Sequence, residues 1–161
     1  MDNKKEKLED FKTAISSTVR SISNSEKIEV SFGNQTPKSE KNSIKLPELS
    51  QINNKLNFDQ IRAMADSKSL NFRFSDDKTF KEYEPVGNIS KRLYKISEKI
   101  RCEKIGTSYF KGVKNNIEKF YQERLSGLDL KSSEDKIIES FENYLRTKFL
   151  DFKNDSQIDK K

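Results

Sequence analysis

The 161-residue chain is long enough for one domain with a core of its own, but little of it is apolar. Hydrophobic residues make up 32% and charged residues 36%, so the eleven phenylalanines and five tyrosines must supply much of any core. Histidine is absent and cysteine occurs once. This excludes a disulfide framework within the chain and argues against an imidazole or thiolate metal site.

The net charge of +6 comes mostly from lysines that alternate with acidic residues. Nucleic-acid recognition usually depends on arginine, so a solvated surface is the favoured interpretation and a basic nucleic-acid-binding domain is the alternative. No apolar run approaches the length of a membrane span, and the charged N-terminus lacks the apolar region of a signal peptide. We therefore expect a cytoplasmic protein without a membrane partner.

The N-terminal part of the chain predicts one helix followed by two strands. Apolar residues at three- and four-residue steps form a helical stripe: Leu8, Phe11, Ile15, Val19 and Ile22. The segments "KIEVSF" and "SIKLPEL" then alternate apolar and polar residues, as half-buried strands do. Pro47 should end the second strand, because proline donates no ladder hydrogen bond. Together the two segments predict a small antiparallel β-hairpin with a long polar loop.

The rest of the chain predicts four more amphipathic helices. The first is capped by Asn57 and runs to about Lys68, while residues 69–74 fit a helix or a strand equally well. After a loop at 75–87, Asn88 should cap the next helix and Gly106 should end it. A further helix follows, and Ser133 opens the last one. The apolar stripe predicted for the last helix is Ile137, Phe141, Tyr144, Leu145, Phe149 and Phe152.

The fold class predicted from these elements is mainly α, with about five amphipathic helices and one small antiparallel β-hairpin. We expect one helical domain over residues 8–152. Residues 1–7 should form a disordered tail, and residues 153–161 a second disordered tail or the start of a linker.

The stretch "IRCEKIGTSYFKGVKNN" combines the only cysteine with several charged residues. Cys102 lacks a histidine base and lies beside an apolar stripe, so we interpret it as a structural residue rather than a nucleophile. Glu98 and Arg101 are three positions apart, and Lys99 and Glu103 are four apart. This spacing is typical of a surface charge lattice on a helix.

Other candidate sites have simpler interpretations. The acidic residues of the loop at 76–84 do not follow the spacing of a calcium-binding loop, and a solvated loop is favoured. The five glycines form neither of the phosphate-binding motifs G-x-x-x-x-G-K-[ST] and G-x-G-x-x-G. Gly106 and Gly112 are expected to shape a turn between two helices. No catalytic constellation is evident, so the residues alone favour a protein-binding domain over an enzyme.

Several segments, in order, resemble the N-terminal domain of CobT-type cobaltochelatase subunits. The resemblance covers about residues 8–150. In "IRCEKIGTSYFKGVKNNIEKFY" the matching residues are Arg101, Cys102, Glu103, Ile105, Gly106, Phe110, Gly112, Val113, Asn116 and Ile117. In "FKTAISSTVRSIS" they are Phe11, Lys12, Ala14, Thr18 and Arg20. "EVSF" and "KLPEL" resemble a strand and a short segment of the family, and "IRAMADSKSLNFRF" matches at Arg62, Ala63, Asp66, Leu70 and Arg73.

The resemblance implies a role in aerobic cobalamin biosynthesis, as part of a complex that inserts cobalt into a corrin ring with ATP. The implied partners are a ring-forming AAA+ ATPase subunit and a large corrin-binding subunit. The sequence contains no D-x-S-x-S motif, so the metal site of the family's von Willebrand A-type domain cannot be carried over. We expect an N-terminal fragment or a truncated homologue.

The predicted role is therefore a non-catalytic assembly or docking domain. No catalytic, cofactor-binding or metal-binding residue is expected in this chain, and ATP, magnesium and cobalt belong to the wider complex by resemblance. The candidate partner interface is Glu98, Arg101, Glu103 and Tyr109, and the structural turn is Gly106 and Gly112.

Overall fold

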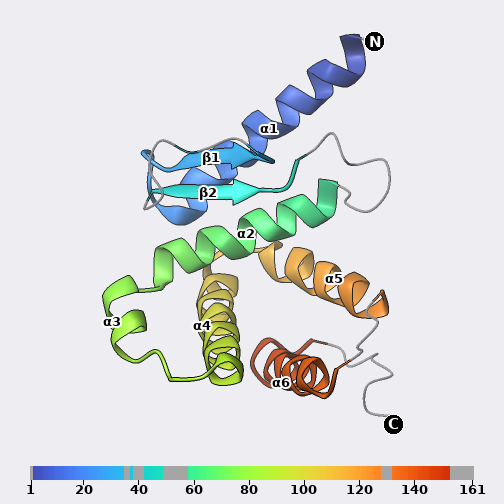
Figure 1. Cartoon of the computed structure of the whole chain (residues 1–161). Helices are drawn as coiled ribbons and strands as arrows, with labels where there is room; N and C mark the ends of the chain where they lie inside the picture. The colour runs from blue at the N-terminus through green and yellow to red at the C-terminus, as the bar shows by residue number, and fades with distance from the viewer. Residues whose placement is uncertain (1, 35–36, 38–41, 49–57, 128–131, 153–161) are drawn as a thin grey trace. The chain divides into compact units, whose positions relative to one another are not determined.

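The computed structural model describes residues 2–34, 37, 42–48, 58–127 and 132–152 and is mainly helical (Figure 1). By their internal contacts the residues divide into two compact units, Met1–Arg73 and Phe74–Lys161. The elements, in chain order, are α1 (Asp2–Ser23), β1 (Glu29–Phe32), β2 (Ser43–Leu46), α2 (Phe58–Phe74), α3 (Asp77–Glu82), α4 (Asn88–Tyr109), α5 (Val113–Ser126) and α6 (Ser133–Leu150).

The first unit is built on one apolar cluster to which all four of its elements contribute. The predicted stripe of α1 supplies Ile15 and Val19, and both are buried. The remaining buried members come from the two strands, the residue before β1, and α2: Ile28, Phe32, Ile44, Leu46, Ile61 and Ala65. The elements are also joined by polar contacts. Arg73 donates to the carbonyl of Ile22 (3.0 Å), and Lys68 donates to the carbonyl of Lys45 (2.6 Å).

The two strands pair in parallel, so the predicted antiparallel hairpin is wrong. Val30 faces Ile44 in the ladder, and both arrows in Figure 1 point the same way. Alternation of apolar residues is the same in both arrangements and cannot distinguish them. Residues 33–42 connect the strands and can reach roughly 30 Å, so the length of the connection permits a return along a four-residue strand and a parallel pair.

The middle of the chain is more helical than the sequence pattern predicts. Helix α2 continues to Phe74, which resolves the ambiguous residues 69–74 as helix. The segment predicted as a loop contains the short helix α3. Its start follows a local signal, because Asp76 is the N-cap and accepts a hydrogen bond from the backbone NH of Thr79 (2.7 Å). The predicted cap Asn57 lies outside the described residues.

In the second unit, α4 packs against both α5 and α6. Helix α4 begins after the N-cap Gly87, so Asn88 is its first residue rather than its cap. It continues through the buried Gly106 and ends at Tyr109, so the predicted break or end at Gly106 is wrong. Gly112 is the N-cap of α5 with a φ of 92°, a backbone conformation that favours glycine. Helix α6 begins at Ser133, as predicted, and Ser132 is its N-cap.

Helix α6 turns a different face inward from the one that its apolar residues predict. Its buried residues are Ile138, Glu142, Asn143, Arg146 and Leu150. From the predicted apolar stripe, Phe152 is buried, whereas Ile137, Tyr144 and Phe149 are more than half exposed. Glu142 and Arg146 occupy the inner face because Arg146 pairs there with both Glu142 and Glu103.

Helix α1 begins at Asp2, within the segment 1–7 predicted as a disordered tail, and residues 153–161 lie outside the described part. A single domain over residues 8–152 stays a prediction. None of the described helices has a segment that is both long and apolar enough to cross a membrane.

The turn after β1 generates a first prediction. Gly33 has a φ of 62°, and a Cβ placed there would lie only 2.8 Å from the Cβ of Glu48. Gly33→Ala should therefore lower the free energy of unfolding by about 1–3 kcal/mol, measured by urea denaturation.

Gly127→Ala is the matched control. Its φ is −100° and the nearest atom to an added Cβ is 3.9 Å away. It should change stability by less than about 0.5 kcal/mol. Equal effects at the two glycines would contradict the assigned turn geometry.

Candidate functional site: a buried ion network and the surface around Phe74

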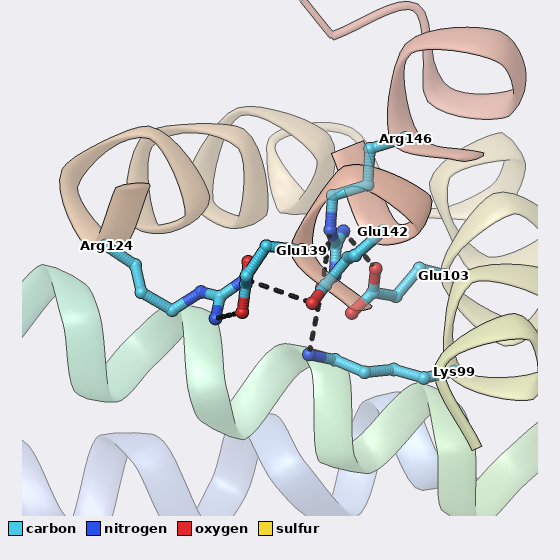
Figure 2. Close-up of polar contacts among 6 residues, drawn as sticks. All are labelled: Lys99, Glu103, Arg124, Glu139, Glu142 and Arg146. Atoms are coloured by element: carbon cyan, nitrogen blue, oxygen red, sulfur yellow. Dashed lines mark hydrogen bonds and ion pairs between the residues drawn. The ribbon is translucent and has the colours of Figure 1, made fainter. Parts of the chain in front are cut away.

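Charged side chains from α4, α5 and α6 converge inside the second unit, as Figure 2 shows. The residues are Lys99, Glu103, Arg124, Glu139, Glu142 and Arg146, which we call the buried ion network. Three are acidic and three are basic, so their formal charges balance. Glu103, Glu142 and Arg146 are buried, whereas the side chains of Lys99 and Arg124 are 41% and 31% exposed. A buried charge is costly unless it is paired, so the three buried residues can pack only together.

Arg146 is the centre of the network, and its side chain is only 2% exposed. Its Nη1 donates to Oε2 of Glu103 on α4 (2.6 Å). Its Nε and Nη2 both donate to Oε1 of Glu142, one turn earlier on α6 (2.9 and 2.8 Å). The planar guanidinium therefore connects α6 to α4 through short charge-assisted hydrogen bonds.

Arg124 extends the network to α5. It makes a bidentate pair with Glu139, at 2.8 and 2.9 Å, and its Nη2 also donates to Oε2 of Glu142 (3.0 Å). Lys99 of α4 lies 4.0 Å from Oε1 of Glu142. Glu142 is thus shared by charged partners from all three helices.

The ring of Tyr121 lies against both arginines of the network. The guanidinium carbons of Arg124 and Arg146 are 5.0 and 4.6 Å from its centroid, within the range of cation–π attraction. The ring of Phe152 lies 5.7 Å from the guanidinium carbon of Arg146. Among the described residues, the buried Tyr121 hydroxyl has no hydrogen-bond partner. Burial raises the pKa of Tyr121, and the charge of Glu142 raises it further.

The electrostatics of the network favour its charged form. Burial alone would raise the pKa of Glu142, but the positive charges of Arg146, Lys99 and Arg124 together lower it below its ordinary value. Burial likewise disfavours charge on Arg146, but Glu103 and Glu142 raise its pKa. The ion pairs are therefore intact at neutral pH, where they hold the three helices together.

The four predicted interface residues do not lie in one place. Glu103 is fully buried in the ion network, so its interpretation as a surface charge is wrong. The other three meet around Phe74, the last residue of α2. Arg101 donates to the carbonyl of Phe74 (2.7 Å), and Tyr109 stacks on its ring with centroids 6.1 Å apart.

Glu98 supports Arg101 at this position. It accepts hydrogen bonds from Nε and Nη2 of Arg101 (2.7 and 2.8 Å) and from the hydroxyl of Ser75 (2.7 Å). The Arg101 hydrogen bonds are the main reason that the pKa of Glu98 is lowered. The predicted local pair of Glu98 and Arg101 is therefore confirmed. Tyr109, which is 70% exposed, is the most accessible of the group.

Cys102 is buried behind this surface, and its Sγ lies 3.7 Å from Oε1 of Glu98. Burial, followed by the negative charge of Glu98, raises the pKa of Cys102 to about 12. Almost no thiolate is then present at neutral pH, in agreement with a structural role. Within the described ranges, no three Cys, Asp or Glu side chains are grouped so that they could hold a metal ion.

The arginines and carboxylates of α5 and α6 were missed as site residues. One signal was available: Ile138, Glu142, Arg146 and Leu150 follow one another at four-residue steps and so share a helix face. A charge pair between two apolar positions indicates a buried pair. The partner Glu103 is far away in sequence, so no local spacing identifies it.

Removal of one buried partner should be costly. Glu103→Gln leaves the Arg146 charge poorly compensated and should lower the free energy of unfolding by about 3–5 kcal/mol. Replacing both residues with apolar ones, Glu103→Leu with Arg146→Met, should cost less than the single change. Urea denaturation monitored by circular dichroism measures both.

Glu134→Gln is the control, because Glu134 forms an exposed pair with Arg92. It should cost less than about 1 kcal/mol. If Glu103→Gln were no more harmful than this control, the buried network would not stabilise the fold.

The network also predicts a pH dependence. Because the pKa of Glu142 is lower in the folded than in the unfolded chain, its contribution to stability is present above about pH 4.5 and is lost as the pH falls through the folded-state pKa. Between about pH 5 and pH 3, Glu142→Gln should show a shallower loss of stability than the wild type, by up to about 1.4 kcal/mol per pH unit. Parallel pH profiles would show that Glu142 does not titrate with unfolding.

A comparison with known protein families places the chain. The family model for cobalamin biosynthesis protein CobT matches residues 5–143. The match includes α4, α5 and the first part of α6, with Glu142 but without Arg146. No solved structure matches the chain. The match covers most of the sequence and agrees with the resemblance seen in its motifs. The chain belongs to the CobT family of cobalamin biosynthesis proteins, and this membership implies a role in cobalamin biosynthesis.

Proposed function

We propose that the chain is a non-catalytic docking domain of a cobaltochelatase. In this role it binds the AAA+ ATPase subunit and the large corrin-binding subunit, and so supports ATP-dependent cobalt insertion into the corrin ring. The observation that carries the proposal is the family match over residues 5–143. The docking role at the level of this domain is our own inference from that membership.

The chemistry of the second unit supports docking rather than catalysis by these groups. Arg146, the most buried arginine of the network, donates from Nε, Nη1 and Nη2 to carboxylates of the chain itself. The raised pKa of Cys102 makes its thiol a poor nucleophile. These groups hold α4, α5 and α6 in place and leave recognition to the surface.

The surface around Phe74 is the candidate docking site, with Arg101 and Tyr109 as its accessible members. The Arg101 side chain is 48% exposed and held in position by Glu98 and the Phe74 carbonyl. The ring of Tyr109 lies beside it, stacked on Phe74 while most of the residue stays exposed. Arginine and tyrosine are enriched among residues that dominate binding energy, and a pre-positioned side chain loses less entropy on binding.

A binding experiment with separate subunits tests the proposal. The purified chain is immobilised and exposed to the AAA+ subunit, the large subunit, or both, at physiological salt. Tyr109→Ala should weaken retention of at least one subunit by about tenfold or more, because an exposed ring at the centre of a contact is lost. Circular dichroism shows whether each variant remains folded.

Tyr83→Ala is the matched control, since Tyr83 is also an exposed tyrosine of the second unit, at 66%. Its retention should equal that of the wild type. Equal losses for Tyr83 and Tyr109 would contradict the assigned surface. Failure of the folded wild-type chain to retain either subunit would contradict the docking role itself.

A further inference from the structure

Helix α6 carries a second apolar face that the packing of its own unit covers only in part: Phe141 is half-buried, and Glu134 makes an exposed pair with Arg92 of α4. The inward face runs through Ile138, Glu142, Arg146 and Leu150 at four-residue steps. A different set of residues follows alternating steps of three and four: Glu134, Ile137, Phe141, Tyr144 and Lys148. We call this set the outer stripe of α6. Its two central residues with the largest free surface are Ile137, 55% exposed, and Tyr144, 59% exposed.

The spacing of the outer stripe identifies the shape of its partner. Alternating steps of three and four keep residues on one line when two helices pack lengthwise. The stripe is apolar in the middle and charged at both ends, as the seam of a short helix pair is. A partner helix would remove Ile137, Phe141 and Tyr144 from water together.

The charges at the two ends of the stripe favour, as the partner, α6 of a second copy of the chain in antiparallel orientation. Glu134 lies near the N-terminus of α6 and Lys148 near its C-terminus, each about two helical turns from Phe141. When two copies cross antiparallel at Phe141, each Glu134, which is 44% exposed in its pair with Arg92 of its own chain, also faces the Lys148 of the other copy. A parallel pair would instead oppose like charges at both ends. The stripe is thus complementary to itself under a two-fold rotation.

We propose that the outer stripe of α6 pairs antiparallel with the outer stripe of a second copy of this chain. The pair is centred on Phe141, buries Ile137 and Tyr144 of both copies, and is closed by two Glu134–Lys148 contacts. The inference uses only α6 and does not depend on the proposed docking to cobaltochelatase subunits.

Sedimentation equilibrium of the full chain, from low micromolar to several hundred micromolar, tests the association. A reversible monomer–dimer equilibrium is expected, and a monomer over the whole range would overturn the proposal. Tyr144→Lys places two added charges in the seam and should weaken the dimer by at least about tenfold. Ile137→Lys serves the same purpose should Tyr144→Lys fail to fold, as judged by circular dichroism.

Phe149→Lys is the matched control on the same helix. Phe149 is 53% exposed but lies outside the outer stripe. Its substitution should change the dimer dissociation constant by less than about threefold. If Phe149→Lys weakened the dimer as much as Tyr144→Lys, association would not depend on the outer stripe and the proposal would fail.

Charge reversal tests the antiparallel direction. Glu134→Lys alone creates two lysine–lysine contacts, and Lys148→Glu alone creates two contacts between glutamates. Because Glu134→Lys also removes the exposed pair with Arg92, circular dichroism must show that this variant remains folded. Each variant should dimerise about tenfold more weakly than the wild type. Mixed in equal amounts, the two variants form a heterodimer in which both contacts join opposite charges. The mixture should recover to within about threefold of the wild-type affinity, and a mixture no tighter than its components would overturn the antiparallel pairing.

Discussion

The second unit depends on the placement of one cation, Arg146, inside a helical core. Its guanidinium is nearly without access to water and is held by Glu103 from α4 and Glu142 from α6. Since an unpaired charge in this position would cost several kcal/mol, the three residues can be buried only together. The position of α6 against α4 therefore follows from the geometry of this pairing as much as from apolar packing.

The same constraint explains which face of α6 is buried. The helix has apolar residues on two faces, and only one of them also presents Glu142 and Arg146 to α4 and α5. Turning the apolar outer stripe inward would place these charges elsewhere and break their contacts with Glu103 and Arg124. Pairing of charges thus takes precedence over burial of Ile137 and Tyr144, whose free surface is what makes association with another helix favourable.

The surface around Phe74 is also positioned by a charge pair, that of Glu98 and Arg101. Glu98 and Arg101 are a local pair on α4, and Arg101 also donates to the carbonyl of Phe74, the first residue of the second unit. The pair therefore holds the start of the second unit against α4, in addition to any role in recognition. Tyr109 makes a ring contact on the same residue while most of its surface remains free. Arg101 and Tyr109 are thus both held in position by Phe74 and still exposed, as suits a binding surface that is rigid before its partner arrives.

The sequence by itself determined the existence of the five longer helices, the α1 stripe, the end of β2 before Pro47, and the family, because all of these depend on local spacing and on motifs in order. It also indicated that Cys102 is structural, since no histidine exists to activate it. Only the tertiary structure decided the direction of β2, the burial of Glu103 and the face that α6 turns inward. Each of these depends on partners far away in sequence. A period of two or of three to four residues specifies that a face exists, but not which distant side chain will cover it or neutralise its charge.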